Sequence, residues 1–210
     1  MEKETWALLG AAAAVGIPLV FNTIKETTFE FIKIKRERRY IIVQVIFILD
    51  RYIADCEFLS RNEGIYDPET EQNEMVYTWP KLDLNSVKGD YKYLNTDLLY
   101  RLHSIETKHT QVRNELTNID ESFYYDAPEF TAYYNLRQNL YARHGLYVAK
   151  LSEDICRIFK IKHISWENGF NPTESILATL RIKRDKKAAA TIRRKEIRAS
   201  RIMKEKNVNL

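Results

Sequence analysis

The chain has 210 residues, of which 45% are hydrophobic and 30% charged, and it carries a formal net charge of +4. This apolar content is enough for one core of ordinary size, whereas 6 Gly and 5 Pro are too few turn-forming residues for an all-β domain. Charged residues spread through long runs without Gly or Pro are typical of solvated helical surfaces. The composition therefore predicts an all-α protein.

An uncharged stretch of twenty residues, Thr5 to Ile24, lies near the start of the chain. Twenty mostly apolar residues form a helix long enough to cross the hydrocarbon core of a bilayer, which is about 30 Å thick. The acidic residues before the stretch do not fit a secretory signal peptide. We therefore predict an uncleaved single transmembrane helix within residues 1–26, and its membrane-spanning residues include Trp6, Leu8, Leu9, Gly10, Gly16, Pro18 and Phe21.

Basic residues that follow this stretch predict its orientation. They are Lys25, Lys33, Lys35, Arg36, Arg38 and Arg39. Positive flanks stay on the cytoplasmic side of a membrane helix, so we expect an inner (cytoplasmic) membrane protein with its amino terminus outside. Small residues four apart, such as Gly10 and Ala14, would let two such helices approach closely in a homo-oligomer. The alternative is a hydrophobic helix buried in the domain or in an oligomer.

The body of the chain, residues 27–180, shows helical patterning in four places. After a basic patch that begins at Lys35, apolar residues recur at threes and fours over 42–59, and over 95–119 they form the strict seam of a coiled coil. The next helix, 126–160, begins with a capping sequence and carries one apolar face that ends at Ile158. The short break before it makes the two helices antiparallel neighbours in a bundle. A further capped helix begins with the sequence NPTE, residues 171–174.

Residues 62–93 interrupt this pattern with an irregular excursion. Unstructured connections of this length are uncommon inside compact domains and are often functional. The excursion is rich in aromatic residues, which are costly to leave bare in water. We predict a surface for an unknown protein partner at Tyr77, Trp79, Tyr91 and Tyr93.

Residues 181–210 form a basic tail. Between Arg181 and Lys206 there are twelve Lys or Arg against three acidic residues, a local charge of +9, so the rest of the chain is acidic. Such a tail binds phosphates on anionic lipid or, nonspecifically, on nucleic acid, and the alternative is a solvated helix that binds neither. The contact residues that we predict are Arg181, Lys183, Arg184, Lys186, Lys187, Arg193, Arg194, Lys195, Arg198 and Arg201.

Catalytic and metal-binding motifs do not stand out in the sequence. Cys56 and Cys156 are too far apart for a CxxC metal site, so we expect reduced, buried thiols, with a disulfide between them as the alternative. His109 and His144 fall in apolar seams, where a hydrogen-bonded packing role is expected. A site formed by His103, Glu106 and His144 is geometrically conceivable, but it lacks the carboxylates of a di-metal bundle. We predict neither a cofactor nor an enzyme.

These observations favour a membrane-anchored cytoplasmic scaffold that binds partners through the 62–93 excursion and the basic tail. A soluble helical protein that binds nucleic acid through the tail is the second hypothesis. An enzyme with a site around His103 and His144 is the third.

Overall fold

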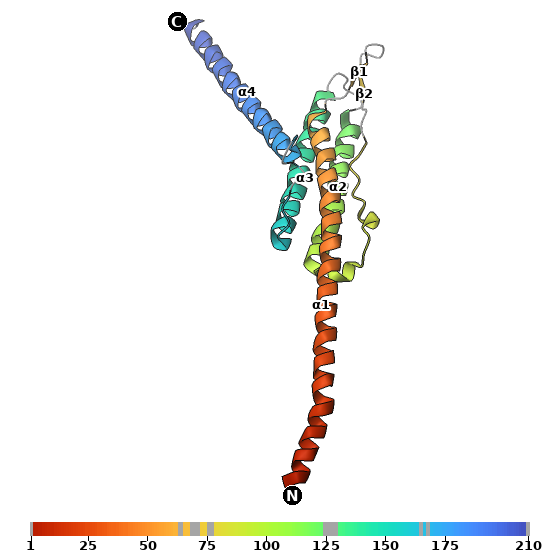
Figure 1. The fold of residues 1–210 in the computed structure, drawn as a ribbon. Coiled ribbons are helices and arrows are strands. Elements are labelled where there is room, and N and C mark those ends of the chain that lie inside the picture. The colour runs from red at the N-terminus through yellow and green to blue at the C-terminus, as the bar shows by residue number, and fades with distance from the viewer. Residues whose placement is uncertain are drawn as a thin grey trace.

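The computed structural model describes the backbone of residues 2–62, 65–67, 72–74, 78–123, 130–163, 166 and 169–208, and the side chains of 21–62, 78–118, 133–163, 166 and 169–198. Four helices dominate these residues (Figure 1): α1 (Glu2–Arg61), α2 (Thr96–Phe123), α3 (Phe130–Phe159) and α4 (Pro172–Val208). The strands β1 (Ile65–Asp67) and β2 (Gln72–Glu74) pair in a short antiparallel hairpin. The prediction of an all-α fold with long helices is confirmed.

Helix α1 is one continuous helix of 60 residues, about 90 Å long. The sequence predicts two separate helical segments here, but no Gly, Pro or cap divides residues 19–61, so the helix has no reason to stop between them. Its amino-terminal half projects beyond the bundle, and its second half belongs to the bundle (Figure 1).

Among the residues whose side chains the structure describes, no helical stretch is both long enough and apolar enough to cross a membrane. Most of the predicted membrane-spanning residues lie outside those described side chains; they are Trp6, Leu8, Leu9, Gly10, Gly16 and Pro18. Phe21 is described, and its side chain is 66% exposed.

Helix α3 lies at the centre of the bundle and contacts the other three helices. The second half of α1 packs along it, α2 runs antiparallel beside it, and the first turns of α4 cross it near the end of α1 (Figure 1). The antiparallel arrangement of α2 and α3 and the apolar seam of α2 are therefore as predicted. The fully buried side chains of this core include Ile41, Ile42, Val45, Leu49, Leu102, Ile105, Tyr141, Val148 and Ile155.

The buried face of α3 is wider than the single stripe that its sequence predicts. Arg137, Gln138 and Ser152 are also buried, because α3 has neighbours on three sides. At the far end of the helix the predicted stripe fails, since Ile158 is 63% exposed.

The segment before α2 is held against α1. It contains two short 3-10 turns, η1 (Leu84–Ser86) and η2 (Tyr91–Tyr93). The Gln44 side chain donates to the carbonyl of Lys88 and accepts from its backbone N–H, both at 2.9 Å. The next residue, Gly89, has φ of 128°, and a Cβ atom there would lie 2.7 Å from Ile41. Part of the predicted irregular excursion is thus an ordered strap on the bundle.

Gly145 lets three helices meet at one point of the core. A Cβ atom built on this α3 residue would lie 2.9 Å from Ile176 of α4 and 3.0 Å from the Cβ of Cys56 in α1. We expect Gly145→Val to lower the free energy of unfolding by about 2 kcal/mol, because overpacking a core forces its neighbours apart. Chemical denaturation measures this change.

The control is Gly169→Val, where a Cβ atom would have no neighbour within 4 Å. Its effect should stay within about 0.5 kcal/mol. Equal stability of the two variants would contradict the close approach at Gly145.

Candidate interaction surfaces

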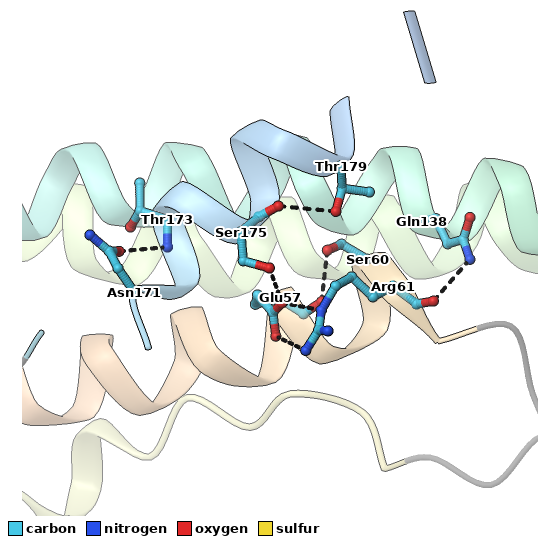
Figure 2. Close-up of polar contacts among 8 residues, drawn as sticks. All are labelled: Glu57, Ser60, Arg61, Gln138, Asn171, Thr173, Ser175 and Thr179. Carbon is cyan, nitrogen blue, oxygen red and sulfur yellow. Dashed lines mark hydrogen bonds and ion pairs between the residues drawn. The ribbon is translucent and has the colours of Figure 1, made fainter. Parts of the chain in front are cut away.

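The root of α4, residues 172–183, is fixed to the carboxyl-terminal end of α1 by partly buried polar contacts (Figure 2). The Asn171 side chain caps α4 by accepting from the backbone N–H of Thr173 at 3.0 Å, as the sequence predicts. Glu57 of α1 is only 3% exposed and forms an ion pair with Arg61. The Ser175 hydroxyl donates to Glu57 Oε1 at 2.5 Å, so α4 completes the hydrogen bonding of a buried carboxylate.

Helix α3 contributes to the same junction. Gln138 donates from Nε2 to the carbonyl oxygen of Asn62 at 3.1 Å, and Arg137 donates to the same oxygen at 2.5 Å. These bonds satisfy a carbonyl at the end of α1 that has no partner within its own helix. Lys183 of α4 donates to Gln138 Oε1. Contacts with α1 and α3 therefore fix the direction in which α4 leaves the bundle.

Beyond the root, α4 projects into solvent (Figure 1). Lys183 is half-buried at the junction, and Arg184 forms an exposed ion pair with Asp185 at 3.2 Å. The other predicted contact residues with described side chains are exposed: Arg181, Lys186, Lys187, Arg193, Arg194, Lys195 and Arg198. The side chain of Arg201 lies outside the described residues.

The part of α1 between the uncharged stretch and the bundle is also exposed. Phe29 and Phe31 are 64% and 67% exposed, and the basic residues over 25–39 share this surface. Arg38 is the member of that group that reaches the bundle, because its Nε donates to the carbonyl of Tyr93 at 2.7 Å.

The aromatic residues predicted as a partner surface pack partly against the core. Trp79 stacks on Tyr141 with ring centroids 5.8 Å apart, and the Tyr91 hydroxyl donates to the carbonyl of Leu84 at 2.5 Å. Lys92 lies 5.1 Å from the centre of the Tyr93 ring. Tyr77 lies outside the described residues. These rings thus contribute to holding residues 78–93 on the bundle, and the surface for a partner stays a prediction.

Two buried histidines join the three long helices of the bundle. His144 of α3 is hydrogen-bonded to the hydroxyl of Tyr52 in α1 at 2.9 Å, and His109 of α2 to that of Tyr141 in α3 at 2.9 Å. The two imidazole rings stack 5.8 Å apart. Burial lowers the pKa of both groups, that of His144 to about 4. Hydrogen-bonded packing histidines are what the sequence predicts.

His103 does not face His144, contrary to the conceived site. It is exposed, and His109 lies beside His144 instead. Helix α2 ends at Phe123 and α3 begins at Phe130, each a few residues later than the sequence predicts, which shifts the register between the two helices. Among the described residues, no cluster of His, Cys, Asp or Glu has the geometry of a metal site.

Both thiols are buried and free, in agreement with the expectation of reduced cysteines. Burial raises the pKa of Cys56 well above its ordinary value, which keeps it protonated and unreactive. Burial also raises the pKa of Cys156, and the nearby carboxylates of Asp50 and Glu153 add to that effect.

Two polar contacts of the core have no signal in the sequence. Buried Asp50 of α1 pairs with His163 Nε2 at 2.9 Å, beside a cavity of about 410 Å³ that Ser152 and Trp166 also line. Glu57 and Ser175 are the other case. Each pair joins residues more than a hundred positions apart, and no local pattern relates such positions.

Comparison of the chain with protein-family models, with curated proteins and with solved structures gives no match.

Stability should depend on pH through His144. Its pKa falls from 6.5 to about 4 on folding, so the unfolded chain binds the proton more readily between these values. The free energy of unfolding should therefore decrease as the pH falls through this window, by roughly 2 kcal/mol near pH 4.5 from this group. We expect His144→Gln, which does not titrate, to flatten the pH dependence in denaturation curves. Exposed His103→Gln should keep the wild-type slope, and equal slopes in the two variants would refute the assignment.

The contact between Ser175 and Glu57 should stabilise the root of α4. Ser175→Ala leaves a buried carboxylate oxygen without this donor, and we expect it to cost about 1 to 2 kcal/mol of unfolding free energy. Hydrogen exchange of the amides over 176–183 should become faster. The control is Thr179→Ala, because the Thr179 hydroxyl donates to the carbonyl of Ser175 within the same helix. Protection that is unchanged in Ser175→Ala would show that the bond does not hold α4.

Proposed function

We propose that the protein is a membrane-anchored, non-catalytic scaffold whose helical bundle and basic tail bind partners on the cytoplasmic side. The observation that carries the proposal is the continuity of α1. One unbroken helix contains the uncharged stretch of residues 5–24 and the core face of the bundle, and it takes the uncharged stretch away from the bundle (Figure 1).

The residues at the end of the uncharged stretch and just beyond it support this assignment. Phe21, Ile24, Phe29 and Phe31 expose most of their surface, although they lie within eleven positions on a single helix. Apolar side chains gathered in this way mark a site that binds another surface. Apolar side chains such as Phe and Ile suit the acyl side of the boundary with the headgroups, and the basic residues that follow suit the cytoplasmic headgroups.

The exposed cations over 25–39 also support the proposed orientation. They lie between the uncharged stretch and the bundle, and under the positive-inside rule this position favours a cytoplasmic bundle and tail with the amino terminus outside. The proposal assigns no reaction. The buried polar pairs described above each join two elements of the fold, which is a packing role.

A test of the anchor compares the full chain with the variant Val15→Arg/Leu19→Arg in fractionated cells. Each arginine near the centre of a span opposes insertion by about 3 kcal/mol, so the variant should leave the membrane fraction, while the full chain resists high-salt and carbonate washes. The matched control is Thr27→Arg/Thr28→Arg, which adds the same charge at exposed positions beyond the stretch and should stay with the membrane. Wild-type protein in the soluble fraction would overturn the proposal.

A soluble, nucleic-acid-associated helical protein is the second candidate. It is favoured by the exposure of the cations along α4. In that case the uncharged stretch would be buried in an oligomer, and the fractionation above separates the two candidates.

A further inference from the structure

We infer that the outer part of α4, residues 184–198, binds the phosphate backbone of duplex nucleic acid, and that it does not bind the headgroups of the membrane that anchors the chain. The inference rests on the proposed function, which supplies the anchor and the tail as a contact surface. It is carried by the direction of α4 and by the distribution of charge around it.

The direction of α4 separates the tail from the membrane. The two termini lie at opposite ends of the molecule, and α4 leaves the bundle away from the projecting half of α1 (Figure 1). Its root is fixed at Glu57, which lies about 50 Å along α1 from residue 25, at 1.5 Å per residue. Electrostatic attraction to headgroups is screened within about 10 Å at ordinary salt. The cations of α4 are therefore beyond the reach of the anchoring bilayer.

The charge distribution around α4 excludes an interfacial membrane helix. Lys187, Arg194 and Arg198 are seven and four positions apart, so they share one face of the helix. The opposite face contains Asp185 and Glu196, together with Ala189 and Ile192. A helix that lies in a bilayer interface buries the face opposite its cations among acyl chains, and two carboxylates on that face forbid this.

Duplex nucleic acid fits the same surface. It presents one negative charge per about 1.7 Å of axis, and cations bind it by releasing condensed counterions. Because exposed cations cover more than half of the circumference of α4, the helix can contact the phosphates in several rotational orientations about its axis. Residues 181–210 contain no Phe, Tyr or Trp, so stacking on unpaired bases is not available. The expected binding is independent of sequence, sensitive to salt and stronger for duplex than for single strands.

The test uses the full chain reconstituted in neutral phosphatidylcholine nanodiscs and a labelled DNA duplex of roughly 20 base pairs, titrated between about 50 and 200 mM salt. The tail variant is Lys187→Gln/Arg194→Gln/Lys195→Gln/Arg198→Gln. We expect its affinity to fall roughly tenfold or more at the lower salt, and the salt slope to decrease by about 0.9 for each phosphate that the variant no longer neutralises. The control variant is Lys81→Gln/Lys88→Gln/Arg143→Gln/Lys150→Gln, which removes four exposed cations from the bundle and should bind like the wild type.

Wild-type affinity in the tail variant, equally weakened binding in the two variants, or absence of duplex binding by the wild type would each overturn the inference. Vesicles containing phosphatidylglycerol are added as a competitor at equal accessible phosphate. If they displace the duplex fully, the ligand of the tail is lipid and the inference fails. The proposed function is tested separately by the fractionation of cells. If wild-type protein washes off the membranes, the proposed function fails, whatever the result with the duplex.

Discussion

The packing of the second half of α1 against α3 is the constraint on which the other elements depend. Gly145 allows the two backbones to approach, and the bond between Tyr52 and His144 fixes their register. Helix α2 covers one side of α3, and the root of α4 occupies the junction at the end of α1. The same packing also determines the directions of the two projecting segments, the amino-terminal half of α1 and the outer part of α4. Each of them continues a helix whose other part is packed in the bundle.

Buried polar groups give this bundle its specificity. An apolar seam alone tolerates shifts in the register between two helices and alternative helix pairings. A buried hydrogen bond, in contrast, is satisfied in one arrangement only. His109, His144, Glu57 and Gln138 each bond to a neighbouring helix or to the end of one. Losing such a partner leaves a desolvated group, so the alternative arrangements are costly.

The elements that the sequence predicts well are those with strong local signals. The seam of α2 and the Asn171 cap of α4 depend on residues within a few turns of each other, and both are present in the structure. The register between α2 and α3 is predicted less well, because it depends on where an intervening turn is centred. The continuity of α1 escapes prediction because two segments of different composition suggest two helices. Contacts such as that between Asp50 and His163 depend on tertiary packing, and no periodic pattern in the sequence predicts them.

The order in which the chain is synthesised makes the core of this bundle late to form. Tyr52 and His144 are 92 positions apart, and Glu57 and Ser175 are 118 apart. At about 5 to 20 residues per second, the apolar face of α1 waits roughly 5 to 20 seconds for α3 to leave the ribosome, and longer for α4. By contrast, α2 packs on α3, α3 on α4 and β1 on β2, and the members of each pair follow one another in the chain. Nascent α1 therefore exposes its apolar face to water for longer than α2 or α3 does before its packing partner is synthesised.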